Sequence, residues 1–211
     1  MKIDLILVLV LLTNLKLLGS SRLGATIRTV AAQGMILGLL PLLAHGSPPL
    51  RVAILAAGTI GLKGIVFPWL LFRALREAEV NREVEPYVGY VSSLLLGLLG
   101  LAASFWLGTR LPLSTVVPSA LLAPVAFFSI LCGLFLIISR KRAVNQVLGF
   151  LVLENGIFTF GAGVVAEAPI LVEAGVLLDV FVGVFVMGIA IFHINREFDH
   201  IDTDRLSTLK D

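Results

Sequence analysis

Residues 143–164 read AVNQVLGFLVLENGIFTFGAGV, an apolar run with one acidic residue, Glu154, near its middle. A helix of about 20 apolar residues crosses the hydrocarbon core of a bilayer, so this run is long enough to span a membrane. Residues 170–194 form a second such run, with Asp179 inside it. An ionised side chain at the bilayer centre costs about 3 kcal/mol or more, and acids at this depth usually face a bundle interior, a partner or a proton path. Two of them on neighbouring runs indicate a protein that handles protons or ions.

The composition of the whole chain agrees with a membrane location. Of its 211 residues, 58% are hydrophobic and only 14% are charged, against about a quarter charged in soluble domains, and the mean hydropathy is +1.02. Apolar runs occur at 3–18, 24–44, 52–71, 88–107, 118–138, 143–164 and 170–194. They are apolar on every face, whereas a barrel strand alternates in polarity. We therefore predict an all-α integral membrane protein with about seven transmembrane helices.

The basic residues predict how these helices are oriented. If the N-terminus lies outside, the inner loops and tail hold Arg22, Arg28, Arg73, Arg76, Arg82, Arg140, Lys141, Arg142, Arg196, Arg205 and Lys210, and the outer loops hold Lys2, Arg51 and Arg110. Because Lys and Arg concentrate in cytoplasmic loops, we predict an outside N-terminus and a cytoplasmic C-terminus. The net charge of +2 is thus a topology signal. It does not indicate nucleic-acid binding, since aromatic residues are sparse and form no stacking platform with the basic ones.

Charged and breaker-rich segments divide the chain into three parts. Residues 1–87 form an N-terminal part of three helices ending in a charged cytoplasmic loop, residues 88–117 contain a connecting helix, and residues 118–211 form a second three-helix part with a cytoplasmic tail. The two three-helix parts have similar basic residues where their second helices begin and their third helices end. This similarity suggests a parallel repeat, and chance similarity between apolar helices is the alternative.

The depth of Glu154 and Asp179 makes them the first candidates for a proton relay. They lie at similar distances from the outer ends of two antiparallel neighbouring helices, which places them at nearly equal depth. They are expected either to approach each other through one or two waters or to face separate partner helices. A purely structural role is the alternative, in which the acids hold helices together through hydrogen bonds with Asn155, Asn145 or Gln146.

Two further titratable residues are candidates for the same relay. Lys63 lies inside the third apolar run, five residues before Pro68, and a desolvated lysine can pair with a carboxylate in a proton pathway. Its expected partner is Glu154 or an acid on another chain, and snorkelling or a structural salt bridge is the other interpretation. His193 lies at the inner end of the last run, where it would pass protons to the cytoplasm or anchor the helix at the interface.

The chain shows no pattern for a cofactor, a metal or soluble-type catalysis. Its single cysteine, Cys132, cannot build a disulfide or a metal cluster and is expected to be a small packing residue. The three histidines have no metal-ligand spacing, and no nucleophile–base pair or phosphate-binding glycine loop is present. We predict no catalytic centre, no cofactor and no metal in this chain.

Two stretches resemble a known family of membrane subunits. Residues 139–158, SRKRAVNQVLGFLVLENGIF, resemble the second helix of the K subunit of respiratory complex I and of the related C subunit of Mrp sodium/proton antiporters. Residues 177–207, LLDVFVGVFVMGIAIFHINREFDHIDTDRLS, resemble the third helix of that subunit. Glu154 and Asp179 fall on the two family glutamates, although Asp179 is shorter by one methylene. The resemblance covers the C-terminal part only, so Lys63 inherits no role from it.

The longer architecture is similar to component E of hydrogenase-4 and formate hydrogenlyase, a membrane subunit of group 4 [NiFe] hydrogenase complexes. The resemblance implies a non-catalytic subunit in the inner membrane of a prokaryotic cell, set among antiporter-like membrane subunits of an oxidoreductase complex. Its implied function is to relay protons through intramembrane carboxylates and to couple redox chemistry to H⁺ or Na⁺ translocation. Two alternatives are a structural spacer that anchors antiporter-like subunits and a subunit of a multi-subunit cation/proton antiporter.

Overall fold

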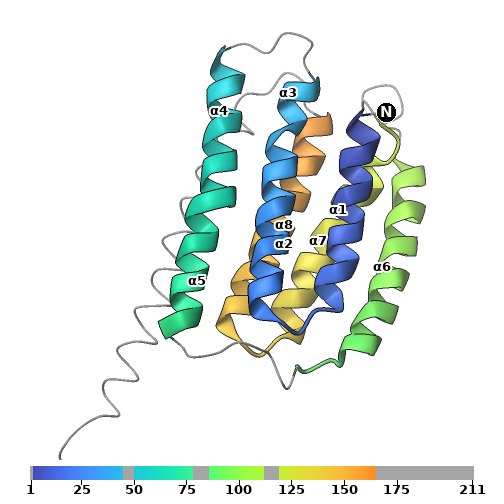
Figure 1. Ribbon diagram of the computed structural model, residues 1–211. Helices are drawn as coiled ribbons and strands as arrows, with labels where there is room; N and C mark the ends of the chain where they lie inside the picture. The colour runs from blue at the N-terminus through green and yellow to red at the C-terminus, as the bar shows by residue number, and fades with distance from the viewer. Residues whose placement is uncertain (1, 45–49, 78–85, 112–118, 165–211) are drawn as a thin grey trace, which may run out of the picture.

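The computed structural model describes residues 2–44, 50–77, 86–111 and 119–164 (Figure 1). The elements in these ranges are all helices. In chain order they are α1 (Lys2–Leu18), α2 (Leu23–Gly38), α3 (Leu40–Ala44), α4 (Leu50–Gly61), the π-helical segment η1 (Leu62–Val66), α5 (Phe67–Glu77), α6 (Tyr90–Arg110), α7 (Leu122–Ser139) and α8 (Ala143–Val164). They coincide with the predicted apolar runs up to the run at 143–164, and the last run, at 170–194, lies outside the described residues. The prediction of an all-α fold is confirmed for the described part.

Four helical stretches of the described chain are long and apolar enough to cross a membrane. They are Leu23–Leu43, Val52–Arg76, Tyr90–Arg110 and Leu122–Ser139. The first combines α2 with α3, and the second combines α4, η1 and α5. These stretches support the predicted membrane protein, while the number of seven spans and the orientation of the chain stay predictions.

The bundle packs its first two helices, α1 and α2, against its last two described helices, α7 and α8 (Figure 1). Helices α7 and α8 form an antiparallel pair, α1 packs against α7, and α2 packs against α8. Helix α6 covers α7 and α1 on one side, and the continuous α4–η1–α5 helix covers α2 on the other. The core is a cluster of apolar side chains from these helices that includes Leu17, Ile27, Leu71, Phe128 and Leu148. The three-part division stays a prediction, and the helices of its first part pack directly on those of its last.

Hydrogen bonds show which loops share an end of the bundle. Arg140, between α7 and α8, donates from Nη2 to the carbonyl of Leu18, the last residue of α1, at 2.8 Å. Its guanidinium lies 4.5 Å from the ring centre of Tyr90 at the start of α6. At the opposite end, Ser119 donates to Oδ1 of Asp4 at 2.7 Å. The α1–α2 and α7–α8 loops therefore lie together, and a buried cation satisfies a helix C-terminus there.

Helices α7 and α8 approach so closely that glycine is needed at their contact. A Cβ on Gly156 would lie 2.7 Å from the backbone nitrogen of Ile130 and 2.9 Å from the carbonyl oxygen of Ala126. A Cβ on Gly149 would lie 2.9 Å from the carbonyl oxygen of Gly133. Small residues at such positions let membrane helices pack backbone to backbone. This contact fixes the rotation of α8 and therefore the direction in which its polar residues face.

Candidate functional site

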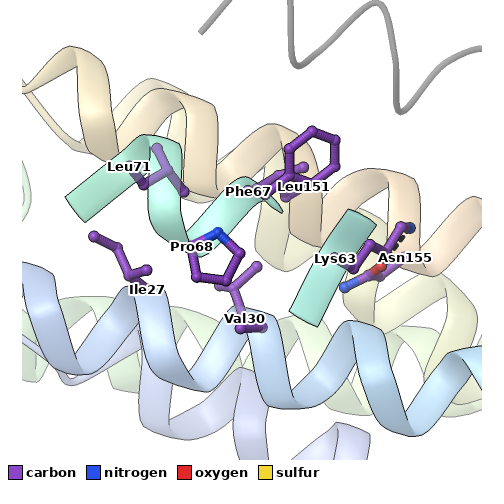
Figure 2. A pocket seen from close by; sticks show the side chains of 9 residues that line it. Ile27, Val30, Lys63, Phe67, Pro68, Leu71, Leu151 and Asn155 are labelled. Atoms are coloured by element: carbon purple, nitrogen blue, oxygen red, sulfur yellow. Dashed lines mark hydrogen bonds between the residues drawn. The ribbon is translucent and has the colours of Figure 1, made fainter. Parts of the chain in front are cut away.

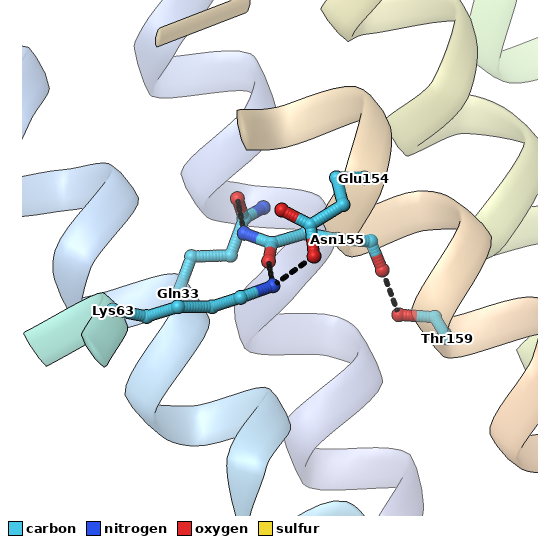
Figure 3. A network of polar contacts seen from close by, with 5 residues as sticks. All are labelled: Gln33, Lys63, Glu154, Asn155 and Thr159. Carbon is cyan, nitrogen blue, oxygen red and sulfur yellow. Dashed lines mark hydrogen bonds and ion pairs between the residues drawn. The ribbon is translucent and has the colours of Figure 1, made fainter. Parts of the chain in front are cut away.

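A buried ion pair joins the middle of the α4–η1–α5 helix to α8. The Nζ atom of Lys63 lies 2.8 Å from Oε1 of Glu154, and the two side chains are 6% and 2% exposed (Figure 3). The second carboxylate oxygen, Oε2, is buried and accepts no hydrogen bond within the described part of the chain. The ring centre of Phe158 lies 5.7 Å from the ammonium nitrogen. Since desolvation offsets much of the attraction in such a pair, its persistence depends on further hydrogen bonds.

Asn155 supplies one of those hydrogen bonds. Its Oδ1 accepts from Lys63 Nζ at 2.9 Å, and its Nδ2 donates to Oε1 of Gln33 on α2 at 3.2 Å. Its backbone carbonyl accepts from the hydroxyl of Thr159, one turn later, at 2.7 Å. Figure 3 shows these side chains converging from α2, η1 and α8. A charged cluster thus forms where three helices meet.

The polar contacts continue from Gln33 into α1 and α7. Gln33 donates from Nε2 to Oδ1 of Asn14 at 2.7 Å and to the hydroxyl of Thr13 at 3.2 Å. Asn14 donates from Nδ2 to the hydroxyl of Ser129 on α7 at 2.7 Å. Asn14, Gln33 and Ser129 are fully buried. The hydrogen bonds therefore run without a break from the ion pair to Ser129 on α7.

Pro68 explains why the helix around Lys63 is irregular. Proline has no backbone N–H, and its ring crowds the carbonyl four residues earlier, which belongs to Gly64. The helix widens here into the π segment, in which the N–H of Phe67 donates to the carbonyl of Leu62. Single π turns occur often at functional sites. The irregular turn sets the direction from which Lys63 enters the bundle.

Gly34 on α2 makes room for the stem of Lys63. A Cβ at this position would lie 2.8 Å from Cβ and 2.9 Å from Cδ of Lys63. Both distances are shorter than van der Waals contact, and Cβ of Lys63 cannot move without its backbone. The side chain of Lys63 therefore reaches Glu154 by passing directly over a glycine.

Replacing Gly34 with alanine should destabilise the protein. The added methyl group overpacks a filled site, which costs about 1–3 kcal/mol in the free energy of unfolding. Gly61→Ala is the matched control, because a Cβ there meets nothing within 4 Å and alanine is the better helix former. Thermal unfolding of the purified protein in detergent should show a lower midpoint for Gly34→Ala alone. Equal midpoints for the two variants would contradict the close contact.

A small cavity lies beside the ion pair. Its volume is about 10 Å³, which is on the order of the room that one water molecule needs. Lys63 and Asn155 lie at one end of it, and apolar side chains of α2, α5 and α8 form the other walls (Figure 2). The cavity extends from Lys63 towards Ile27 and Leu71, on the side where α2 begins and α5 ends (Figure 2).

The structure brings two of the four predicted relay residues together. Lys63 pairs with Glu154 of the same chain, which is one of the two partners that the sequence left open. Asp179 and His193 lie outside the described residues, so the predicted approach of Asp179 to Glu154 stays a prediction.

The polar neighbours of Glu154 were predicted only in part. Asn155 takes part in the cluster, whereas Asn145 lies in the first turn of α8 and Gln146 is exposed. Asn14 and Gln33 were not identified as candidates. Their only signal in the sequence was a polar side chain inside an apolar run, and such a run does not show which face points inward.

Cys132 is buried on α7, as expected for a packing residue. Its Sγ lies 3.7 Å from the backbone carbonyl oxygen of Asn14. Within residues 2–44, 50–77, 86–111 and 119–164, no group of three His, Cys, Asp or Glu side chains is placed to hold a metal ion.

These features define the class of the protein: a bundle of membrane-type helices with a charged pair and a hydrogen-bonded amide cluster at its centre. Comparison with known proteins then gives the family. The chain is 37% identical over 194 residues to "Uncharacterized protein Rv0085" of Mycobacterium tuberculosis, covering 90% of this chain and 87% of the relative. It is 28% identical over 162 residues to "Hydrogenase-4 component E" of Escherichia coli and of Shigella flexneri, covering 76% of this chain and 74% of those proteins. The chain belongs to the same family as the mycobacterial protein, and its homology to hydrogenase-4 component E confirms the resemblance that its sequence predicted.

The match to hydrogenase-4 component E extends beyond the C-terminal part of the chain. It covers 76% of the residues, which is more than residues 118–211 contain. The N-terminal helices that contribute to the charged cluster therefore lie partly within the matched region. No protein-family model and no solved structure matches the chain.

Proposed function

We propose that this chain is a non-catalytic membrane subunit of an energy-converting hydrogenase complex and that it relays protons through intramembrane carboxylates. The observation that carries the proposal is the Lys63–Glu154 pair, 2.8 Å long and buried in the bundle. A charged pair in such a place is costly, and removing it in favour of apolar residues is often neutral or stabilising. If these two positions served packing alone, apolar side chains there would make the protein at least as stable as the ion pair does. The presence of the ion pair therefore supports a functional role.

Glu154 is the proton carrier in this proposal. One carboxylate oxygen is held by Lys63, and the other accepts no hydrogen bond within the described residues, so a proton can bind there without displacing a hydrogen bond. When Glu154 becomes protonated, its attraction to Lys63 falls, and the ammonium group keeps its hydrogen bond to Asn155. Loss of the proton restores the ion pair.

The proton route continues on both sides of the ion pair. Water enters through the cavity beside Lys63, which extends towards the end of the bundle where α2 begins and α5 ends. Asp179 exchanges protons with Glu154, and His193 passes them to the cytoplasm. In this arrangement the chain has seven transmembrane helices, an outside N-terminus and a cytoplasmic C-terminus in the prokaryotic inner membrane. Its partners are the antiporter-like subunits of the membrane arm.

The experiment replaces each acid by its amide in the assembled complex. We expect Glu154→Gln and Asp179→Asn to lower proton translocation strongly, measured per assembled complex and relative to hydrogen production or uptake, because a carboxamide takes up no further proton near neutral pH. Translocation is measured in inverted membrane vesicles beside the hydrogenase reaction. Asp4→Asn is the control, because Asp4 lies in the first turn of α1, at the end of the bundle. Full translocation in both acid variants would support a structural spacer instead.

A further inference from the structure

The amide side chains of Asn155, Gln33 and Asn14, here called the amide chain, have a fixed hydrogen-bond direction at the ion pair. An ammonium group has no acceptor, so Lys63 can only donate. The atom of Asn155 that lies 2.9 Å from it must therefore be the carbonyl oxygen. The amide nitrogen of Asn155 then faces Gln33 and donates to its carbonyl oxygen at 3.2 Å.

The far end of the amide chain imposes the same direction independently. Ser129 donates its proton to the backbone carbonyl of Val125 at 2.8 Å, so its oxygen accepts from Asn14. Thr13 likewise donates to the backbone carbonyl of Val10 at 2.7 Å, so its oxygen accepts from Gln33. The backbone carbonyls at this end can only accept. The chain thus points its carbonyl oxygens towards the ion pair and its N–H groups away from it.

The chemistry of the carboxamide group excludes a proton route through the amide chain. A carboxamide keeps both N–H protons and takes up no further one near neutral pH, unlike a carboxylate or an imidazole. Three amides in series therefore end the proton path on the α1–α2 side. The three amides instead fix one another's orientation. Asn155 cannot turn its N–H groups towards Lys63 without breaking its hydrogen bond to Gln33. Aligned hydrogen bonds in a low dielectric also strengthen one another.

We propose that Gln33 is a positioning residue, anchored by Asn14 and Thr13, which keeps the carbonyl of Asn155 aimed at Lys63 and so holds the ammonium group beside Glu154 between proton transfers. This inference rests on the proposed relay function. Gln33 acts through Asn155 and does not itself receive the proton.

The test measures proton translocation at equal electron transfer, and the amount of assembled complex separately. Gln33→Met keeps the length of the side chain and removes its hydrogen bonds. It should lower the rate of translocation per assembled complex about tenfold, which is the loss expected for a weakened hydrogen bond to a charged group. Asn14→Leu should lower it less, because Gln33 keeps Thr13 and the carbonyl of Val10 as acceptors. Gln146→Met makes the same chemical change at an exposed site and should leave the rate unchanged.

The outcomes separate positioning from packing and from failure of the relay itself. A packing role would lower the amount of complex in Gln33→Met but leave translocation per complex at the wild-type rate, and that result would overturn the proposal. If Gln33→Met does not assemble, translocation per assembled complex is measured in Asn14→Leu instead, and a wild-type rate there would overturn the proposal. Full translocation in Glu154→Gln would overturn the relay function as a whole, whereas loss in Glu154→Gln with no loss in Gln33→Met or Asn14→Leu would overturn only the positioning role.

Discussion

Lys63→Met and Glu154→Gln, each made alone, should sharply lower the amount of assembled protein, and the two changes together should largely restore it. Each single change leaves one member of the ion pair buried without its opposite charge. Breaking a buried pair in this way costs about 3–5 kcal/mol, whereas replacing both partners by neutral side chains is often tolerated. The double variant retains a hydrogen-bonding amide next to an apolar side chain of similar length.

The amounts are measured by quantifying the complex in membranes from cells that express each variant at the same level. Thermal unfolding in detergent gives an independent measure for the purified protein. Lys141→Met is the control for the lysine change, because Lys141 is exposed in the loop between α7 and α8. Losses that simply add in the double variant would show that the two side chains do not depend on each other.

Gly156→Ala should also destabilise the folded protein, for a reason that involves no charge. The added Cβ would lie within 2.7–2.9 Å of backbone atoms on α7, which cannot move as a side-chain tip can. The two helices must separate, and overpacking of this kind costs about 1–3 kcal/mol. The separation also moves α8 relative to η1, so the contact between Glu154 and Lys63 should lengthen.

Gly100→Ala on α6 is the matched control, because a Cβ there meets nothing within 4 Å. It should leave the unfolding midpoint unchanged or raise it slightly, since alanine has the higher helix propensity. Unfolding is followed by circular dichroism in detergent. A Gly156→Ala protein as stable as Gly100→Ala would mean that α7 and α8 lie further apart than described.

Much of the fold followed from the sequence because the apolar runs are long and separated by basic or breaker-rich loops. A run of about 20 apolar residues can satisfy its backbone in a bilayer only as a helix. The rotation of each helix about its axis could not be predicted, because a run that is apolar on every side carries no pattern that marks its inward face. The contact between Lys63 and Glu154 depends on those rotations, and glycines at the helix contacts fix them.

The site was predictable only where a residue carried a charge. Glu154 and Lys63 are conspicuous inside apolar runs. The π turn just before Pro68 became apparent only in the structure. Gln33 and Asn14 are uncharged, so nothing in the sequence distinguished them from other polar residues. Their role depends on which helices become neighbours, which is a property of the packed bundle.

Proton translocation by the Lys63→Met/Glu154→Gln double variant is the most direct test of the relay. This variant is expected to assemble, so its translocation can be compared with that of the wild-type complex at equal rates of hydrogen production or uptake. We predict that electron transfer continues and that translocation is lost, because no protonatable group remains at the ion pair. Translocation at the full wild-type ratio would contradict the relay and would leave the pair a structural role only.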